Sequence, residues 1–440
     1  MILANSKDRS RFDWILLSSA IFLVIIGLST VYSTSLSGDE GGGIEKEFYM
    51  QLVWLALGIV LFFAVIAINY TRYVEWAFYL YGIGILALLA VFVFPATGGG
   101  GARWINFGFF TIQPSEPMKL FVIIALARFL SMLGDSIRDI RNFFIFFVIL
   151  VPPLGLIALQ PDFGTSLAFL PICFTMLFVA GAKLEHIFSL LTLGLLGGGI
   201  PMVAAYYKET EDAGGWLADI FSNNALLMDI ALILGIITLV CLLVWFLARK
   251  KKFLSFASTL AVISIGLIIA ASLNSYLKPY QRKRIVAFFD AEKDPWGSGY
   301  NIIQSKIAIG SGGFSGQGFT QGPQNALSFL PENKTDFIYS TFGEEWGFIG
   351  SFLLLLTYFV LLFRATIIAR NAKDTLGSLI ATGIIALFGF HIFVNIGMAT
   401  GLMPVTGLPL PFVSYGGSSL LTNIMALALL VNIDLRRYVY

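Results

Sequence analysis

Charged residues are scarce in this chain. The 28 Lys and Arg and the 26 Asp and Glu make up 12% of its 440 residues, whereas soluble domains carry about 25% charged residues. Hydrophobic residues reach 57%, and the formal net charge is only +2. This composition excludes a disordered, fibrous or ordinary soluble protein, gives no long basic surface for nucleic acid, and indicates a polytopic membrane protein.

Cysteine and histidine are nearly absent. Cys173 and Cys241 lie inside apolar runs, so the sequence offers neither a disulfide framework nor a closely spaced pair of thiolates for a metal. His186 and His391 are isolated in the sequence, which argues against a zinc site. No cleavable signal peptide is evident, because the first apolar run, 14–33, is as long as a membrane span and lacks a convincing cleavage site.

The chain instead contains twelve long apolar runs. A helix that crosses a bilayer needs about 20 mostly apolar residues, and continuous runs without two-residue alternation exclude a membrane barrel. We therefore expect an all-α polytopic integral membrane protein, a single membrane domain over 1–440 with about 12 transmembrane helices. The runs are 14–33, 49–69, 74–95, 115–133, 142–159, 163–181, 184–205, 226–248, 253–275, 345–364, 375–400 and 412–433.

The basic residues predict how these spans are oriented. If the N-terminus is cytoplasmic, seventeen of the 28 Lys and Arg fall on the inner side, and only Lys46, Arg103 and Lys208 fall in short outer loops. The opposite orientation would invert this ratio. We therefore expect both termini in the cytoplasm and the longest connection, 276–344, outside. Aromatic residues recur through that connection, so we expect it to be ordered, with an interfacial or re-entrant helix at Ile302–Ile309.

Polar residues at membrane depth are functional candidates, because they cost roughly 2.5–3.5 kcal/mol each on insertion scales. Glu116 and Lys119 lie three residues apart, so they share one helix face and can pair. They form either a structural ion pair or part of a substrate site, and the sequence leaves both open. Asp162 likewise either caps the sixth span or takes part in function.

Further candidates lie in the long connection and near the C-terminus. Arg282 and Arg284 are suited to a phosphate or to anionic lipid headgroups. Asp294 opens the stretch 294–300, whose proline and glycines are typical of a turn, but its carboxylate could also serve as a general base. The Pro/Gly-rich stretch 404–419 either lines a cavity or forms a plain re-entrant turn.

Taken together, these motifs resemble one family closely, the SEDS proteins of shape, elongation, division and sporulation. The Gln304–Gly313 stretch looks more like the elongation members than the division members. The matching stretches are Arg103-Trp104, Gln113–Glu116 with Lys119, Gln160–Thr165, Tyr280–Arg282, Asp294–Tyr300, Gln304–Gly313, Leu330–Glu332 with Thr335–Ile338, Glu344-Glu345 and Pro411–Ser419.

The resemblance implies a peptidoglycan glycosyltransferase. Such enzymes polymerise lipid II, a disaccharide-pentapeptide on undecaprenyl diphosphate, into β-1,4 glycan strands on the outer face of the cytoplasmic membrane. The reaction inverts the anomeric carbon and releases undecaprenyl diphosphate. The implied partners are lipid II, membrane lipid, the elongation machinery and a class B penicillin-binding protein, the transpeptidase that crosslinks the strands. Nucleic acid is not among them.

The resemblance also implies roles for single residues. Asp294 matches the family's essential aspartate, and we expect it to be the general base. We expect the cations among the binding residues to face the diphosphate. A divalent cation such as Mg²⁺ is chemically reasonable, but no clear carboxylate cage is visible, so no cofactor is assigned. The expected substrate-binding residues are Arg103, Trp104, Glu116, Lys119, Asp162, Arg282, Lys306, Glu345 and Ser414.

One feature departs from the family, which usually has ten spans. We expect the two extra spans to form an inserted hairpin at about 206–252, within 184–275, with Arg249–Lys252 as its inner turn. Two added spans preserve the topology on either side, so the hairpin is expected to be accessory.

Two other functions remain open. A flippase or transporter of lipid-linked precursors would explain twelve spans and a charged pair at membrane depth, but no internal repeat supports it. A non-catalytic scaffold for cell-wall synthases would leave Asp294 replaceable.

Overall fold

The computed structural model is predominantly helical. It describes residues 12–36, 46–94, 103–106, 108, 110–160, 162–209, 220–277, 279–297, 299–327 and 329–437. Within them the chain forms two compact units, one made of Met1–Ala182 with Gln304–Tyr440 and the other of Lys183–Ile303. The long connection 276–344 is therefore divided between the two units, at a point inside a helix.

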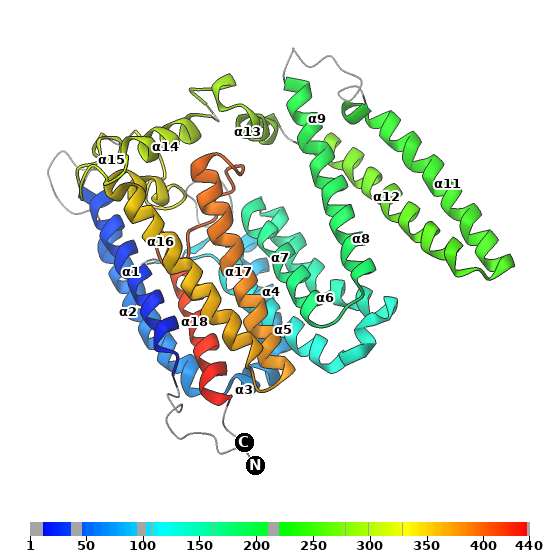
Figure 1. Cartoon of the computed structure of the whole chain (residues 1–440), viewed down its shortest axis with the longest axis horizontal. Helices are drawn as coiled ribbons and strands as arrows, with labels where there is room; N and C mark the ends of the chain where they lie inside the picture. The colour runs from blue at the N-terminus through cyan, green and yellow to red at the C-terminus, as the bar shows by residue number, and fades with distance from the viewer. Residues whose placement is uncertain are drawn as a thin grey trace. The chain divides into compact units, whose positions relative to one another are not determined.

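Among the described residues, ten helices are long and apolar enough to cross a membrane, and two shorter apolar helices, Ala77–Val93 and Gly164–Val179, accompany them (Figure 1). Each of the twelve overlaps one of the apolar runs in the sequence, which confirms the all-α, multi-pass prediction. The ten are Trp14–Leu36, Lys46–Ala67, Ser115–Arg138, Arg141–Leu159, Leu184–Lys208, Asn224–Ala248, Lys252–Tyr276, Ile338–Arg370, Thr375–Thr400 and Gly417–Arg436.

The first unit is a helical bundle with one small hairpin. Its two central helices are α17 (Thr375–Thr400), which packs against α5, α7 and α16, and α18 (Gly417–Arg436), which packs against α2. The other elements are α1 (Trp14–Leu36), α2 (Lys46–Ala67), α3 (Tyr70–Glu75), α4 (Ala77–Val93), β1 (Ile105–Asn106), β2 (Thr111–Ile112), α5 (Ser115–Leu133), η1 (Gly134–Arg138), α6 (Ile140–Leu159), α7 (Phe163–Val179), most of α14 (Tyr300–Ser311), α15 (Pro323–Ala326) and α16 (Ile338–Arg370).

Glycines let the segment before α18 and its first turn pack tightly. A Cβ at Gly27 of α1 would lie 2.6 Å from the Phe412 carbonyl oxygen, and one at Gly417 would lie 2.1 Å from the Trp54 ring. A larger residue at either position would force backbone or a bulky ring to move. This packing holds the start of α18 close to α1 and α2.

The helix α16 is broken at Gly347, whose φ of 61° and ψ of −158° are not helical. The stretch 312–318 satisfies the backbone groups freed at the break. Gln317 and Gly318 donate their N–H groups to the carbonyls of Glu344 and Glu345 at 3.0 and 3.1 Å. In the other direction, Phe348 N–H donates to the Gly313 carbonyl at 2.9 Å, and Ile349 N–H donates to the Phe314 carbonyl at 3.2 Å. Four backbone hydrogen bonds therefore replace helical ones at the break, which lowers its cost in apolar surroundings.

The second unit is built around a helical hairpin. Its core joins Leu196 and Ile200 to Leu227, Ala231 and Leu267. The elements are α8 (Leu184–Gly194), the glycine-rich π-helix η2 (Leu195–Gly199), α9 (Ile200–Glu209), α11 (Asn224–Ala248), α12 (Lys251–Tyr276), α13 (Pro279–Phe289), η3 (Ala291–Lys293) and the start of α14.

The connection 276–344 is ordered where it is described, as expected. The stretch Ile302–Ile309 is helical and lies within α14, whereas its position at the membrane surface stays a prediction. The sequence did not predict α13, because a single stretch of mixed basic and apolar residues gives no clear helical period. It also did not predict the β1–β2 hairpin, in which Ile105 pairs with Ile112, because two residues a strand carry no detectable alternation.

The orientation can be tested by cysteine labelling. Ser315 and Lys252 are both exposed, and the two native cysteines, both buried, can first be replaced by alanine. We expect an impermeant maleimide added to intact cells to label Ser315→Cys but not Lys252→Cys, because the basic residues place 276–344 outside and Lys252 inside. Permeabilised cells, in which both should react, are the control. Labelling of Lys252→Cys in intact cells would contradict the orientation.

Candidate functional site

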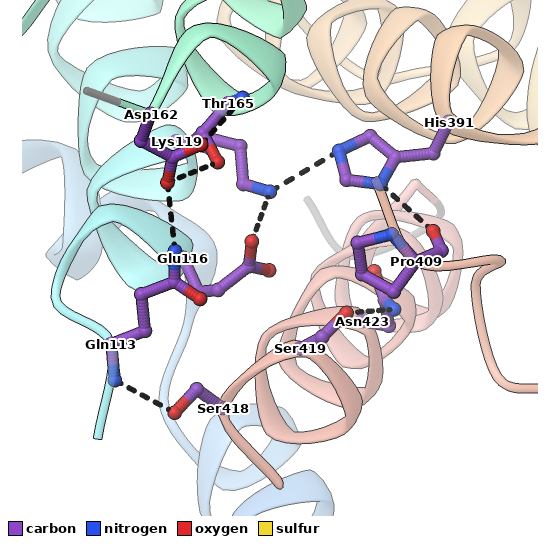
Figure 2. A network of polar contacts seen from close by, with 10 residues as sticks. All are labelled: Gln113, Glu116, Lys119, Asp162, Thr165, His391, Pro409, Ser418, Ser419 and Asn423. Atoms are coloured by element: carbon purple, nitrogen blue, oxygen red, sulfur yellow. Dashed lines mark hydrogen bonds and ion pairs between the residues drawn. The ribbon is translucent and has the colours of Figure 1, made fainter. Parts of the chain in front are cut away.

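A buried ion pair lies in the first turns of α5. Glu116 and Lys119 are 3% and 1% exposed, and Lys119 Nζ lies 2.7 Å from Glu116 Oε1 (Figure 2). The three-residue spacing places both side chains on one face of the helix, as the sequence predicted. Removing one partner of such a buried pair typically costs about 3–5 kcal/mol, because it leaves an uncompensated charge.

The same lysine contacts a second helix. Lys119 Nζ lies 3.2 Å from Nε2 of His391 on α17, and His391 Nδ1 lies 3.2 Å from the carbonyl oxygen of Pro409 (Figure 2). His391 is itself buried, with 2% of its surface exposed. The α5 ion pair is thus connected through α17 to the proline-rich segment that precedes α18.

Asp162 caps α7 and also reaches the start of α5. Its carboxylate accepts hydrogen bonds from Thr165 N–H at 3.2 Å and Thr165 Oγ1 at 2.9 Å, which confirms the predicted cap. Gln113 Nε2 donates at 2.8 Å to Asp162 Oδ2, the oxygen that also accepts from Thr165 Oγ1, and the Gln113 N–H donates to Ser418 Oγ of α18 at 2.9 Å. Asp162 is therefore both the cap of α7 and a polar link from α7 to the start of α5.

We call these contacts the polar network, and Figure 2 shows its members converging from α5, α7, α17 and α18. Buried polar groups are costly unless they are hydrogen-bonded. A network this dense inside an apolar bundle is therefore typical of a binding site or of a specificity device. Asn423 Nδ2 also donates to Ser419 Oγ at 3.3 Å within α18. The members of the polar network are Gln113, Glu116, Lys119, Asp162, Thr165, His391, Pro409, Ser418, Ser419 and Asn423.

Arg103 and Trp104 lead into the β1–β2 hairpin. Arg103 Nε donates to the carbonyl of Gln160 at 3.2 Å, and Gln160 Nε2 in turn donates to the Leu88 carbonyl at 2.9 Å. Gln160 lies two residues before Asp162. Arg103 is thus anchored beside the chain segment that carries this member of the polar network.

In the second unit, Asp294 forms the predicted turn. Its carbonyl accepts N–H bonds from Gly297 at 3.2 Å and Gly299 at 3.0 Å. A Cβ at Gly297 would come within 2.4 Å of the Asp294 carboxylate, and one at Gly299 within 2.1 Å of the Ala291 carbonyl. Gly299 is therefore required by the backbone of the turn, and a side chain at position 297 would displace the half-buried carboxylate. The next aromatic side chain, Trp296, is 89% exposed.

Two basic residues that are predicted to bind substrate lie on helices outside the polar network. Arg282 is on α13 of the second unit, with Nη2 3.5 Å from the Asn274 carbonyl oxygen. Lys306 is exposed on the part of α14 that belongs to the first unit. Their roles in substrate binding stay predictions.

Glu345 and Ser414 have contacts outside the polar network. Glu345 is buried and accepts a hydrogen bond from Ser33 of α1. Ser414 Oγ accepts from Leu410 N–H at 2.9 Å and donates to the Thr335 carbonyl at 2.6 Å. These bonds give Ser414 a structural task in the turn before α18, and its binding role stays a prediction.

Sequence reasoning missed His391 as a site candidate. Its isolation in the sequence argues against a zinc ligand and gives no sign of a partner on another helix. A usable signal was Asn395, four residues on and therefore on the same face of a span. Two polar residues facing one side of an otherwise apolar helix predict a polar partner there.

The described residues contain no group of three or more histidine, cysteine, aspartate or glutamate side chains that could hold a metal ion. Mg²⁺ commonly needs only one or two protein carboxylates when substrate phosphates also bind it, so the divalent cation stays a prediction.

Similar proteins are known. Residues 13–211 and 225–438 match the model of a cell cycle protein family, FtsW/RodA/SpoVE. The chain is 35% identical over 428 residues to the peptidoglycan glycosyltransferase RodA of Treponema pallidum, with 97% of this chain and 98% of the relative covered. It is 33% identical over 442 residues to the peptidoglycan glycosyltransferase MrdB of Escherichia coli K12, with 98% and 97% covered.

A solved structure is also similar. One chain of a peptidoglycan synthase complex that coordinates polymerization and crosslinking is 28% identical, with a TM-score of 0.67 over 98% of this chain and 99% of that chain. The family match leaves out only 212–224 between its two parts, so α12 and nearly all of α11 lie inside it. The inserted hairpin at about 206–252 stays a prediction.

Proposed function

Since the chain belongs to the FtsW/RodA/SpoVE family of cell cycle proteins, we propose that it is a peptidoglycan glycosyltransferase that polymerises lipid II during cell elongation. The observation that carries the proposal is the end-to-end similarity to relatives named as peptidoglycan glycosyltransferases, at 33–35% identity. The chain is a multi-pass membrane protein. We further propose that both termini are cytoplasmic and that the reaction takes place at the outer face.

The reaction joins two lipid-linked sugars. The 4-hydroxyl oxygen of the acceptor attacks the anomeric carbon of the donor on the side opposite the diphosphate. A carbon–oxygen bond forms to the acceptor while the bond to the diphosphate oxygen breaks, which inverts the anomeric carbon. The hydroxyl proton passes to a base, and the diphosphate leaves with the bonding electron pair. No ATP is consumed, because the diphosphate already activates the sugar.

Asp294 is the base in this proposal. It is a carboxylate held in a glycine-dependent turn, and it opens the Asp-Pro-Trp-Gly stretch that resembles the family's essential motif. A positioned general base typically contributes about 10²–10⁴ in rate.

The polar network has a separate task in the proposal. Negative charge develops on the departing diphosphate, and a preorganised cation stabilises it. Lys119 is a buried cation already held by hydrogen bonds, so it needs little reorganisation when that charge appears. Arg103 is a second candidate, because it is anchored beside the segment that carries Asp162.

We also propose a class B penicillin-binding protein as partner. The support is the similarity to a chain of a synthase complex that couples polymerization to crosslinking. Crosslinking is a transpeptidation on the peptide stems, so it needs a second active site.

The proposed function is tested with the purified full chain, alone and together with its transpeptidase, in lipid vesicles that contain lipid II. We expect glycan polymer on a denaturing gel, and its digestion by a muramidase confirms the product. If the intact complex yields no polymer while translocating lipid II across the vesicle membrane, the protein is a transporter. If it does neither, it is a scaffold.

A further inference from the structure

We propose that His391 is a positioning residue that holds the Lys119 ammonium in one orientation. The inference rests on the proposed function, because orientation matters only if Lys119 meets a substrate. It is carried by three contacts in Figure 2: Lys119 with Glu116, Lys119 with His391, and His391 with Pro409.

The contact with Pro409 determines which imidazole nitrogen carries the proton. A carbonyl oxygen can only accept a hydrogen bond, so His391 Nδ1 must be the donor across their 3.2 Å separation. Neutral imidazole has only one N–H. In the neutral ring, Nε2 therefore presents a lone pair toward Lys119.

The segment around Pro409 is itself anchored by side chains. Proline has no N–H, and the carbonyls of 408–411 need donors from elsewhere. Asn395 Nδ2 donates to the Leu408 carbonyl at 2.8 Å, and Tyr358 of α16 donates to the Pro411 carbonyl at 2.7 Å. The Pro409 carbonyl is thus a fixed point, and through it the His391 ring is fixed as well.

Lys119 can form a hydrogen bond to His391 Nε2 only as the donor. The Lys119 ammonium, paired with Glu116 at 2.7 Å, has three N–H groups and no lone pair. One N–H goes to Glu116 and a second to the lone pair of His391 Nε2. Two anchored bonds stop rotation about the Cε–Nζ bond, so the third N–H has one fixed direction. Without His391, the ammonium would keep one anchor and would rotate about it.

This assigns His391 a role beyond filling space. A ring that only packs in the core could be replaced by any side chain of its size. A positioning residue needs an acceptor atom facing Lys119 and a donor facing Pro409. A glutamine amide supplies both, whereas phenylalanine supplies neither.

The test compares His391→Gln and His391→Phe in the full chain with its transpeptidase, with lipid II as substrate. We expect His391→Phe to lower kcat by up to about 100-fold, since a small misplacement of a charged group can cost that much, with KM for lipid II changed much less. We expect His391→Gln to keep most of kcat. Phe393→Leu is the matched control, because Phe393 is exposed on the same helix, and it should behave as the parent.

A double-mutant cycle with Lys119→Ala completes the test. If His391 acts through Lys119, adding His391→Phe to Lys119→Ala lowers the remaining activity no further. Independent, multiplicative losses would overturn the proposal, and so would equal losses in His391→Gln and His391→Phe. Should His391→Phe not give a monodisperse protein, His391→Asn replaces it. Its amide is one methylene too short to span both contacts, so it should lose activity where His391→Gln does not.

Discussion

Purified Asp294→Asn is expected to fold, to bind lipid II and its transpeptidase, and to lose polymerisation by about 10²-fold or more. Asparagine keeps the shape of the side chain, and the bonds from Gly297 and Gly299 go to the backbone carbonyl of residue 294, which the substitution does not alter. What is lost is the carboxylate oxygen that takes the hydroxyl proton. The measurement is the initial rate of glycan polymer formation.

A matched control lies two residues away. Glu292→Gln removes an exposed carboxylate from η3, the short helix that ends just before Asp294, and should leave the rate unchanged. Near-normal polymer from Asp294→Asn would refute the assignment of the base and would direct attention to Asp162 or Glu345. Because the polymerase would then still be active, this result would leave the proposed function standing.

Lys119→Ala should lower polymerisation by about 10²–10³-fold, the typical cost of removing one preorganised group that stabilises developing charge. Glu116→Ala should also cause a sharp loss, because the lysine would lose the bond that holds it at 2.7 Å. If the two residues act as a unit, the double variant is little worse than either single variant. Additive losses would show instead that they act separately.

Stability must be measured alongside activity, since breaking this buried pair is itself destabilising by about 3–5 kcal/mol. Arg72 and Glu75 provide the control, because they form an ion pair with the same three-residue spacing but with side chains 64% and 60% exposed. Replacing either should change neither melting temperature nor activity appreciably. Loss of folded protein in both Lys119→Ala and Glu116→Ala would favour a purely structural ion pair.

Local features of this protein follow from the sequence. Apolar runs of about 20 residues mark the spans, because the bilayer sets their length. The three-residue spacing of Glu116 and Lys119 predicts their pairing, and Asp162 three residues before Thr165 predicts the helix cap. The first inference depends on one continuous run, and the other two depend on residues within one turn of each other.

Contacts between distant segments do not follow in the same way. His391 lies 272 positions from Lys119, and nothing in the spacing of either residue indicates that α5 and α17 are neighbours. The break in α16 also does not follow from the sequence, because the segment that stabilises it is distant in the chain. A glycine inside an apolar run is only a weak signal, and the partner that satisfies the freed backbone groups, 312–318, is some thirty residues away.

That break determines which parts of the molecule can move together. The stretch 312–318 bonds to both sides of the break, to the carbonyls of Glu344 and Glu345 before Gly347 and to the N–H groups of Phe348 and Ile349 after it. A Cβ at Gly347 would lie 2.3 Å from the Gly316 nitrogen, so the two segments are in direct contact. The stretch 312–318 therefore braces α16 across the break. The turns that carry Glu344 and Glu345 should move together with the rest of the helix rather than hinge at Gly347.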